Sequence, residues 1–233
     1  FPQFIYILSI YLFLFSLYLY TYLTFILPIS LIYQSIYVSI SLFVSSMFLQ
    51  SAFAGVDEDV FQLKKTWEQL KYKTLLSEQE KGFESLLAQS EKVTAQYPNK
   101  AEPLIWQGII EGTFAGVRNG IRGQLAALSL VKDAKQHFEQ AIKIDPHGSD
   151  GSAFTSLGSL YYQVPPWPIA YGDNEIAREM LSRGLALNPD GIDANYFYGE
   201  FLFKRGEFNK AAEVLKKGLL AASREGREVA DEG

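Results

Sequence analysis

Hydrophobic and polar positions divide the chain of 233 residues into two unlike parts. Residues 1–56 contain no charged side chain and are mostly Ile, Leu, Phe, Tyr and Ser, whereas charged residues occur throughout the rest, beginning at Asp57. In this second part apolar residues recur every three or four positions, a spacing that predicts amphipathic α-helices. One example is the run Phe83, Leu86, Leu87 and Val93. The pattern predicts an all-α domain over 55–233, preceded by a hydrophobic segment over 1–54.

Three stretches of the second part carry small and large apolar residues at the same offsets. A small residue is followed by a large apolar residue at +4, by another small residue at +7, and by a position that ends the helix at +12. The stretches are Ala134, Phe138, Ala141 and Pro146; Ala177, Leu181, Gly184 and Pro189; and Ala211, Leu215 and Gly218, with Ser223 where Pro would stand. Small residues let one helix approach another closely, and proline ends a helix. The stretches therefore predict the second helices of repeated helix pairs.

The helices that precede these stretches carry a matching signature. Phe154, Leu157, Gly158 and Tyr161 reproduce its aromatic, Leu, Gly and Tyr positions, and Gly108 and Gly199 take the glycine position of their own helices. Together the two halves resemble the tetratricopeptide repeat (TPR). The resemblance implies a right-handed superhelix of about four antiparallel helix pairs. Their expected bounds are 57–98, 99–146, 147–189 and 190–223. The polar tail, 224–233, is expected to start a capping helix.

Two insertions interrupt the repeat, and insertions of this kind often form loops on a binding face. The first, 112–124, is rich in glycine and holds Arg118 and Arg122. Glycine-rich backbone with arginine can cradle an anion, although a flexible loop with solvated arginines is the simpler reading. The second insertion, 163–171, contains three prolines and presents Trp167 and Tyr171. A rigid loop with Trp suits a binding hot spot; in the alternative reading the loop folds back as a lid on its own repeat.

In a TPR superhelix the first helix of each pair lines the concave groove, so the resemblance also nominates groove residues. They are Ile105, Ile109, Tyr162, Tyr196 and Phe203, with Trp106 as a further candidate. Such a face is apolar and aromatic, and it suits an apolar peptide, a helix or a lipid-like small molecule. The alternative reading places these side chains in the core.

A narrower resemblance covers part of the third pair and the loop within it. It is carried by Gly151–Phe154, Leu157, Gly158, Tyr161, Tyr162, Pro165, Pro166, Gly172, Asp173 and Ala177–Glu179. This text is similar to the T-component of TRAP transporters, which implies an exported, ligand-holding accessory of a solute transport system. T-components are lipoproteins, and this chain has no Cys. A closed cavity lined by Trp167, Tyr162 and Trp106 would favour this function, whereas an open groove would favour an adaptor that binds a protein segment.

The hydrophobic segment predicts export. Ala52 and Ala54 form the small-x-small pattern of a signal-peptidase site directly after the apolar run 31–48, so cleavage near Ala54 would release a periplasmic or secreted protein. In the alternative reading the segment is a membrane anchor of one or two spans. Because Phe1 is not an initiator residue, the sequence is expected to be a fragment or an over-extended reading frame, and 1–30 need not be genuine protein.

Composition excludes several functions. The net charge is −5 and no basic run is present, which argues against nucleic acid as a partner. Without Cys there are no disulfides and no thiolate metal sites. His137, expected on a helix surface, and His147 stand alone, and no nucleophile and base are paired. We therefore expect a protein that is not an enzyme, needs no cofactor or metal, and binds a protein or peptide partner, with a small organic ligand as the alternative.

Overall fold

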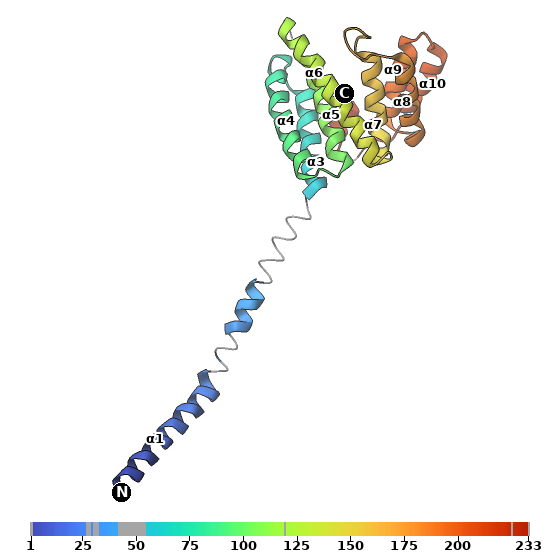
Figure 1. Cartoon of the computed structure of the whole chain (residues 1–233). Helices are drawn as coiled ribbons and strands as arrows, with labels where there is room; N and C mark the ends of the chain where they lie inside the picture. The colour runs from blue at the N-terminus through green and yellow to red at the C-terminus, as the bar shows by residue number, and fades with distance from the viewer. Residues whose placement is uncertain are drawn as a thin grey trace. The chain divides into compact units, whose positions relative to one another are not determined.

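The uncharged segment and the repeat segment form separate units, Phe1–Gly55 and Val56–Gly233, in the computed structural model (Figure 1). The structure describes residues 2–26, 29, 33–41, 55–118, 120–224 and 226–232. In the first unit α1, Pro2–Thr21, continues as the π-helical turn η1, Tyr22–Ile26. A search of the described residues finds no helix with the length and apolarity to cross a membrane. The expected cleavage site at Ala52 and Ala54 lies outside the described residues.

Helices of the second unit follow one another in antiparallel pairs (Figure 1). The pairs are α3, Gly55–Glu68, with α4, Leu76–Gln96; α5, Ala101–Val117, with α6, Gly120–Ile144; α7, Ser152–Gln163, with α8, Asn174–Leu187; and α9, Ile192–Lys204, with α10, Phe208–Leu219. Shorter pieces are the π-helical turn η2, Gln69–Lys73, the 3-10 turn η3, Gly148–Gly151, and α11, Glu228–Glu232. The prediction of an all-α, TPR-type superhelix is confirmed; among the described residues the only extended pairing is an isolated bridge between Pro166 and Gly172.

Each of the last three pairs is locked by a glycine on its first helix and a large apolar side chain on its second. The locks are Gly108 with Phe138, Gly158 with Leu181, and Gly199 with Leu215. A Cβ atom at any of these glycines would lie 2.5 to 2.7 Å from the partner side chain, which is closer than real Cβ contacts. The alanines that open the three stretches, Ala134, Ala177 and Ala211, are buried in the same core. The small residues are therefore required by close helix packing, as their spacing predicts.

The glycine-rich insertion is helical, so the expectation of a loop over 112–124 is wrong. Helix α5 continues to Val117 and α6 already begins at Gly120. Phe114 explains the extension, because its buried ring stacks on Phe83 of α4 at 6.5 Å between ring centroids. Burial of the Phe114 side chain contributes about 1.5–3 kcal/mol, which offsets the roughly 1 kcal/mol by which each of the two glycines in this extension, Gly112 and Gly116, disfavours a helix.

The polar tail also departs from its expected place. Rather than starting a capping helix beyond α10, it turns back, and α11 packs beside η2 of the first pair. Gly226 lies against the ring of Phe61 on α3, with a positive φ of 71° that glycine adopts without strain. The last described residues of the chain thus contact its first helix pair.

Candidate partner-binding site

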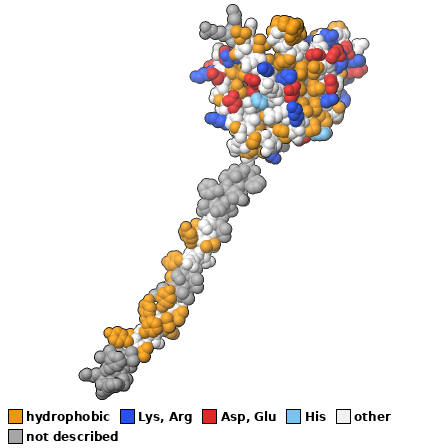
Figure 2. Space-filling view, viewed as in Figure 1, with side chains coloured by type: hydrophobic (Ala, Val, Ile, Leu, Met, Phe, Trp, Pro, Cys, Tyr) orange, Lys and Arg blue, Asp and Glu red, His pale blue; other side chains and the backbone are white. Residues whose placement is uncertain are grey.

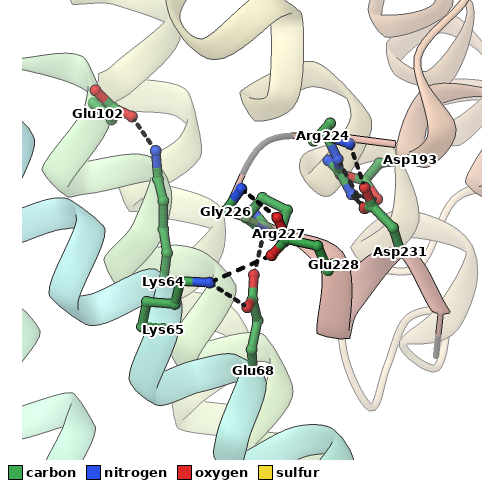
Figure 3. A network of polar contacts seen from close by, with 10 residues as sticks. All are labelled: Lys64, Lys65, Glu68, Glu102, Asp193, Arg224, Gly226, Arg227, Glu228 and Asp231. Atoms are coloured by element: carbon green, nitrogen blue, oxygen red, sulfur yellow. Dashed lines mark hydrogen bonds and ion pairs between the residues drawn. The ribbon is translucent and has the colours of Figure 1, made fainter. Parts of the chain in front are cut away.

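Arg224 joins the tail to the fourth helix pair (Figure 3). Its Nη1 lies 2.6 Å from Oδ2 of Asp193 on α9, and its Nε donates to Oδ1 of Asp231 at 2.9 Å. Burial alone would lower the pKa of Arg224, but the hydrogen bonds to Asp231 and Asp193 raise it above its ordinary value. Burial alone would raise the pKa of Asp231, but the hydrogen bonds that Asp231 accepts from Arg224 lower this pKa by more, so the net shift is downward. Both groups therefore carry their charges at neutral pH.

Arg227 joins the tail to the first helix pair (Figure 3). Its guanidinium forms an ion pair with Glu68 at the end of α3. The Glu68 side chain is 0% exposed, and within the described residues neither of its carboxylate oxygens accepts a hydrogen bond. Its charge is balanced by Arg227 and by Lys65, whose Nζ lies 3.7 Å from Oε2. A buried carboxylate without its cation is strongly destabilising, so Glu68 requires a positive group in this place.

Trp106 forms the aromatic base beneath Arg227. The guanidinium carbon of Arg227 lies 5.0 Å from the Trp106 ring centroid, and Lys64 Nζ lies at 5.5 Å. Trp67 packs edge-on against Trp106 and donates from Nε1 to Thr113 Oγ1 at 2.9 Å, which fixes the ring. Cations over a tryptophan face are attracted by its quadrupole. We call Glu68, Trp106 and Asp193, where the two tail arginines are held, the tail site.

Three tyrosines extend the surface around the tail site. Burial, and then the charge of Asp193, raise the pKa of Tyr72, and Tyr196 adds to the increase, so these groups lie near one another. Burial raises the pKa of Tyr162 far above its ordinary value, as does its hydrogen bond to Glu200 Oε2 at 2.5 Å. Tyr72 and Tyr162 therefore stay protonated and neutral. The three tyrosines come from the first, third and fourth pairs.

Of the nominated groove residues, some belong to the core and others remain accessible. Ile105 is 0% exposed and Trp106 is 5% exposed, while Ile109 and Tyr162 pack partly buried against the core. Tyr196 and Phe203 are 52% and 58% exposed. The sequence reading missed Phe208, which is equally exposed and packs on Phe203 with ring centroids 5.4 Å apart.

The proline-rich loop is anchored at one end and exposed at the other. Tyr171 donates to the backbone oxygen of Val131 on α6 at 2.6 Å and packs edge-on against Tyr161. Burial, and then the neighbouring Tyr161, raise the pKa of Tyr171. Trp167 is 85% exposed. Since Trp106 is buried under Lys64 and Arg227 while Trp167 faces solvent, the two do not line a common enclosed cavity.

Of the two arginines that the sequence predicts in the first insertion, the structure describes the side chain of Arg118 only. The Arg118 guanidinium lies 5.0 Å from the ring of Phe114, and its Nη2 lies 3.9 Å from Oε1 of Glu80. The side chain thus covers helix surface at the end of α5 and is mostly buried, so it is not a solvated loop residue. The side chain of Arg122 lies outside what the structure describes.

A polar cluster that the sequence reading missed lies between α5 and α6. His137, expected at the surface, is partly buried, and its Nδ1 lies 2.8 Å from Oε2 of Glu111. The other carboxylate oxygen of Glu111, Oε1, accepts a hydrogen bond from Gln107 Nε2 at 3.0 Å. Burial lowers the pKa of His137, but the hydrogen bond to buried Glu111 raises it more, so the net shift is upward. A charged residue three positions after Gly108, on the packed side of its helix, was the available signal.

The described residues provide no metal site, and the face seen in Figure 2 carries no continuous basic surface. No group of three or more His, Asp or Glu side chains in the described part of the chain could hold a metal ion. On the face seen in Figure 2, Lys and Arg side chains are interspersed with Asp and Glu side chains. What the described side chains do offer is a site that holds a stretch of polypeptide through two arginines.

Comparison with known proteins agrees with the repeat pattern. Residues 169–231 match the family model for the tetratricopeptide repeat, and no curated protein matches the chain. A thermophilic TPR protein of Thermus thermophilus is 22% identical, covers 64% of this chain and 71% of its own, and gives a TM-score of 0.46. PilF of Pseudomonas aeruginosa is 14% identical over 76% and 89%, with a TM-score of 0.33. MamA of Desulfovibrio magneticus is 18% identical over 69% and 94%, with a TM-score of 0.28.

Proposed function

We propose that this tetratricopeptide-repeat protein is a non-catalytic adaptor that binds a segment of another protein at the tail site. TPR domains are scaffolds for protein–protein interaction, and stacked helix pairs present extended concave surfaces suited to that task. The observation that carries the proposal is the tail itself. A stretch of polypeptide, 224–232, is held against the first helices of the first, second and fourth pairs by ion pairs and an aromatic ring.

The alternative function, a ligand-holding accessory of a TRAP-type transport system, depends on a closed cavity. Trp167 and Trp106 would have to face it together with Tyr162. The exposure of Trp167 and the burial of Trp106 give no support to such a cavity. The adaptor is therefore the better-supported function.

We further propose that the adaptor is exported and that residues 1–54 are removed. The support is the small-x-small pattern of Ala52 and Ala54, which follows the apolar run 31–48. The test is the intact mass of the protein expressed from its native upstream DNA in a Gram-negative host, after periplasm and membranes are separated. A periplasmic species that starts at Gly55 supports export, and a membrane-bound species that keeps residues 1–54 refutes it.

Site-specific photo-crosslinking tests the adaptor function. A photoreactive amino acid replaces Tyr196, which is exposed beside the tail site, or Leu219, which is exposed at the end of α10 and serves as the control. Both variants are expressed in the source organism and irradiated. We expect a discrete cross-linked protein from position 196 but not from 219, and the purified protein should bind again in isolation. Equal products from both positions, or none from 196, would refute the proposal.

A further inference from the structure

The tail site holds two arginines of the same short segment at two separate carboxylates. Arg224 reaches Asp193 on α9, and Arg227 reaches Glu68 on α3 (Figure 3). The two carboxylates come from the first and the last helix pair, so the segment spans from one end of the repeat series to the other. Asp231, the second carboxylate around Arg224, belongs to the tail itself and pairs with the arginine of its own segment.

The burial of the Glu68 carboxylate indicates that this site binds a cation. A carboxylate that is fully buried, with no hydrogen bond to either oxygen among the described residues, contributes nothing favourable to folding unless a positive group is supplied. Lys65 supplies only part of it, from 3.7 Å and with its own amine also 3.8 Å from Glu228 of the tail. The remaining charge comes from Arg227.

Trp106 favours arginine at this position. A planar guanidinium can lay its flat face on the indole while its edge meets a carboxylate, whereas the ammonium of Lys64, 5.5 Å from the centroid of the same ring, acts as a point charge and pairs with Glu102 instead. Arg227 lies over the Trp106 ring and pairs with Glu68 at the same time. Arginine in a buried aromatic setting is also a common hot spot of protein interfaces.

We propose that the tail site recognises a partner segment with two arginines three residues apart, and that Arg224 and Arg227 occupy it as an internal competitor. This inference rests on the proposed adaptor function and names the chemistry of its partner. A partner binds by displacing the tail. The apparent affinity of the partner is therefore its intrinsic affinity multiplied by the fraction of molecules whose tail is undocked. The tail thereby restricts binding to segments that match both carboxylates.

The test uses the full chain and a fluorescent peptide that copies residues 222–232. In the variant Arg224→Gln/Arg227→Gln the internal competitor is weakened, and we expect the peptide to bind this variant about tenfold more tightly than it binds the unmodified protein. Adding Glu68→Gln to the variant should abolish the gain. The control Arg183→Gln removes an exposed arginine that pairs with Glu179 of its own helix, and it should leave peptide binding unchanged.

A second peptide, with both arginines replaced by glutamine, checks the chemistry. It should bind no form of the protein. Equal binding of the two peptides, or equal affinity of the peptide for the unmodified protein and the double variant, would overturn the inference. The adaptor function would still stand if position 196 captured a partner, because that experiment does not depend on arginine.

If the double variant does not fold, a cut chain gives the same information. A protease recognition sequence inserted after the exposed residue Leu220 allows the tail to be severed in protein that has already folded. The arginine peptide should then replace the severed tail, and the glutamine peptide should not. A severed tail that neither peptide replaces would show that the segment is a permanent structural part and would contradict the inference.

Discussion

Replacing Gly158 by alanine probes the helix locks on which the repeat fold depends. A Cβ atom at this position would lie 2.7 Å from Cγ of Leu181 and 2.9 Å from the backbone nitrogen of the same residue. Backbone cannot rotate away, so α7 and α8 must separate. Overpacking of this kind costs about 1–3 kcal/mol, and the helix propensity of alanine returns about 1 kcal/mol. Because one of the two contacts is with backbone, we expect a net loss of about 2 kcal/mol in the free energy of unfolding.

Gly116 provides the matched control. It lies inside α5, is exposed, and has no atom within 4 Å of the position that a Cβ would take. The same substitution there should stabilise the protein by up to about 1 kcal/mol through helix propensity alone. Urea unfolding followed by far-UV circular dichroism measures the free energy of unfolding of both variants. Unchanged m-values would show that the substitutions alter stability alone. A Gly158→Ala protein that is as stable as the unmodified protein would refute the lock between α7 and α8.

Further predictions concern a helix cap, a buried ion pair and the loop anchor. Asp173 accepts hydrogen bonds from two backbone nitrogens at the start of α8, so Asp173→Ala should cost about 1 kcal/mol in urea unfolding, whereas Asp173→Asn should cost little. The folded-state pKa of His137 is raised above 6.5 by Glu111, so the pair stabilises the fold fully below pH 6.5 and loses this contribution as pH rises through the raised pKa. His137→Gln should remove that pH dependence from thermal melting curves, and a slope that persists would contradict the assignment. Tyr171→Phe should cost about 1 kcal/mol by removing the hydrogen bond that the hydroxyl donates to the Val131 carbonyl, and should increase proteolysis of the loop; an unchanged loop would show that the bond is dispensable.

The sequence allowed the helix pairs to be predicted because their packing leaves a periodic signature. The glycines at 108, 158 and 199 and the alanines at 134, 177 and 211 stand at fixed offsets, and each offset reflects one close helix contact. A signature of this kind is local, since each lock joins two neighbouring helices of one pair. Local patterns can be read without knowing how distant segments meet.

The glycine-rich insertion was mispredicted because its structure is decided by a distant contact. Four glycines disfavour a helix locally, but Phe114 is buried against Phe83, which lies in another helix pair. Propensity is a weak preference that tertiary burial overrides. Nothing in the insertion itself identifies Phe83 as the partner.

The tail site escaped prediction for a similar reason. Glu68 and Arg227 belong to opposite ends of the domain, and the domain contains many other charged residues that could have paired with either. Only the curvature of the repeat series brings α3 and α9 close enough for one short segment to reach both. Spacing along the chain carries no information on that curvature, so the charge pairs had to come from the structure.

The most direct test of the account asks whether the tail occupies the tail site and leaves it when a matching segment binds. The chain has no Cys, so Lys65→Cys and Glu228→Cys can be joined selectively by a short thiol-reactive cross-linker, and Lys65→Cys with Leu219→Cys serves as the control pair. We predict efficient cross-linking of residues 65 and 228 in the isolated protein, little for the control pair, and a lower yield when the arginine peptide of residues 222–232 is present in excess. A yield that the bound peptide does not change, or no cross-link in the isolated protein, would contradict the account.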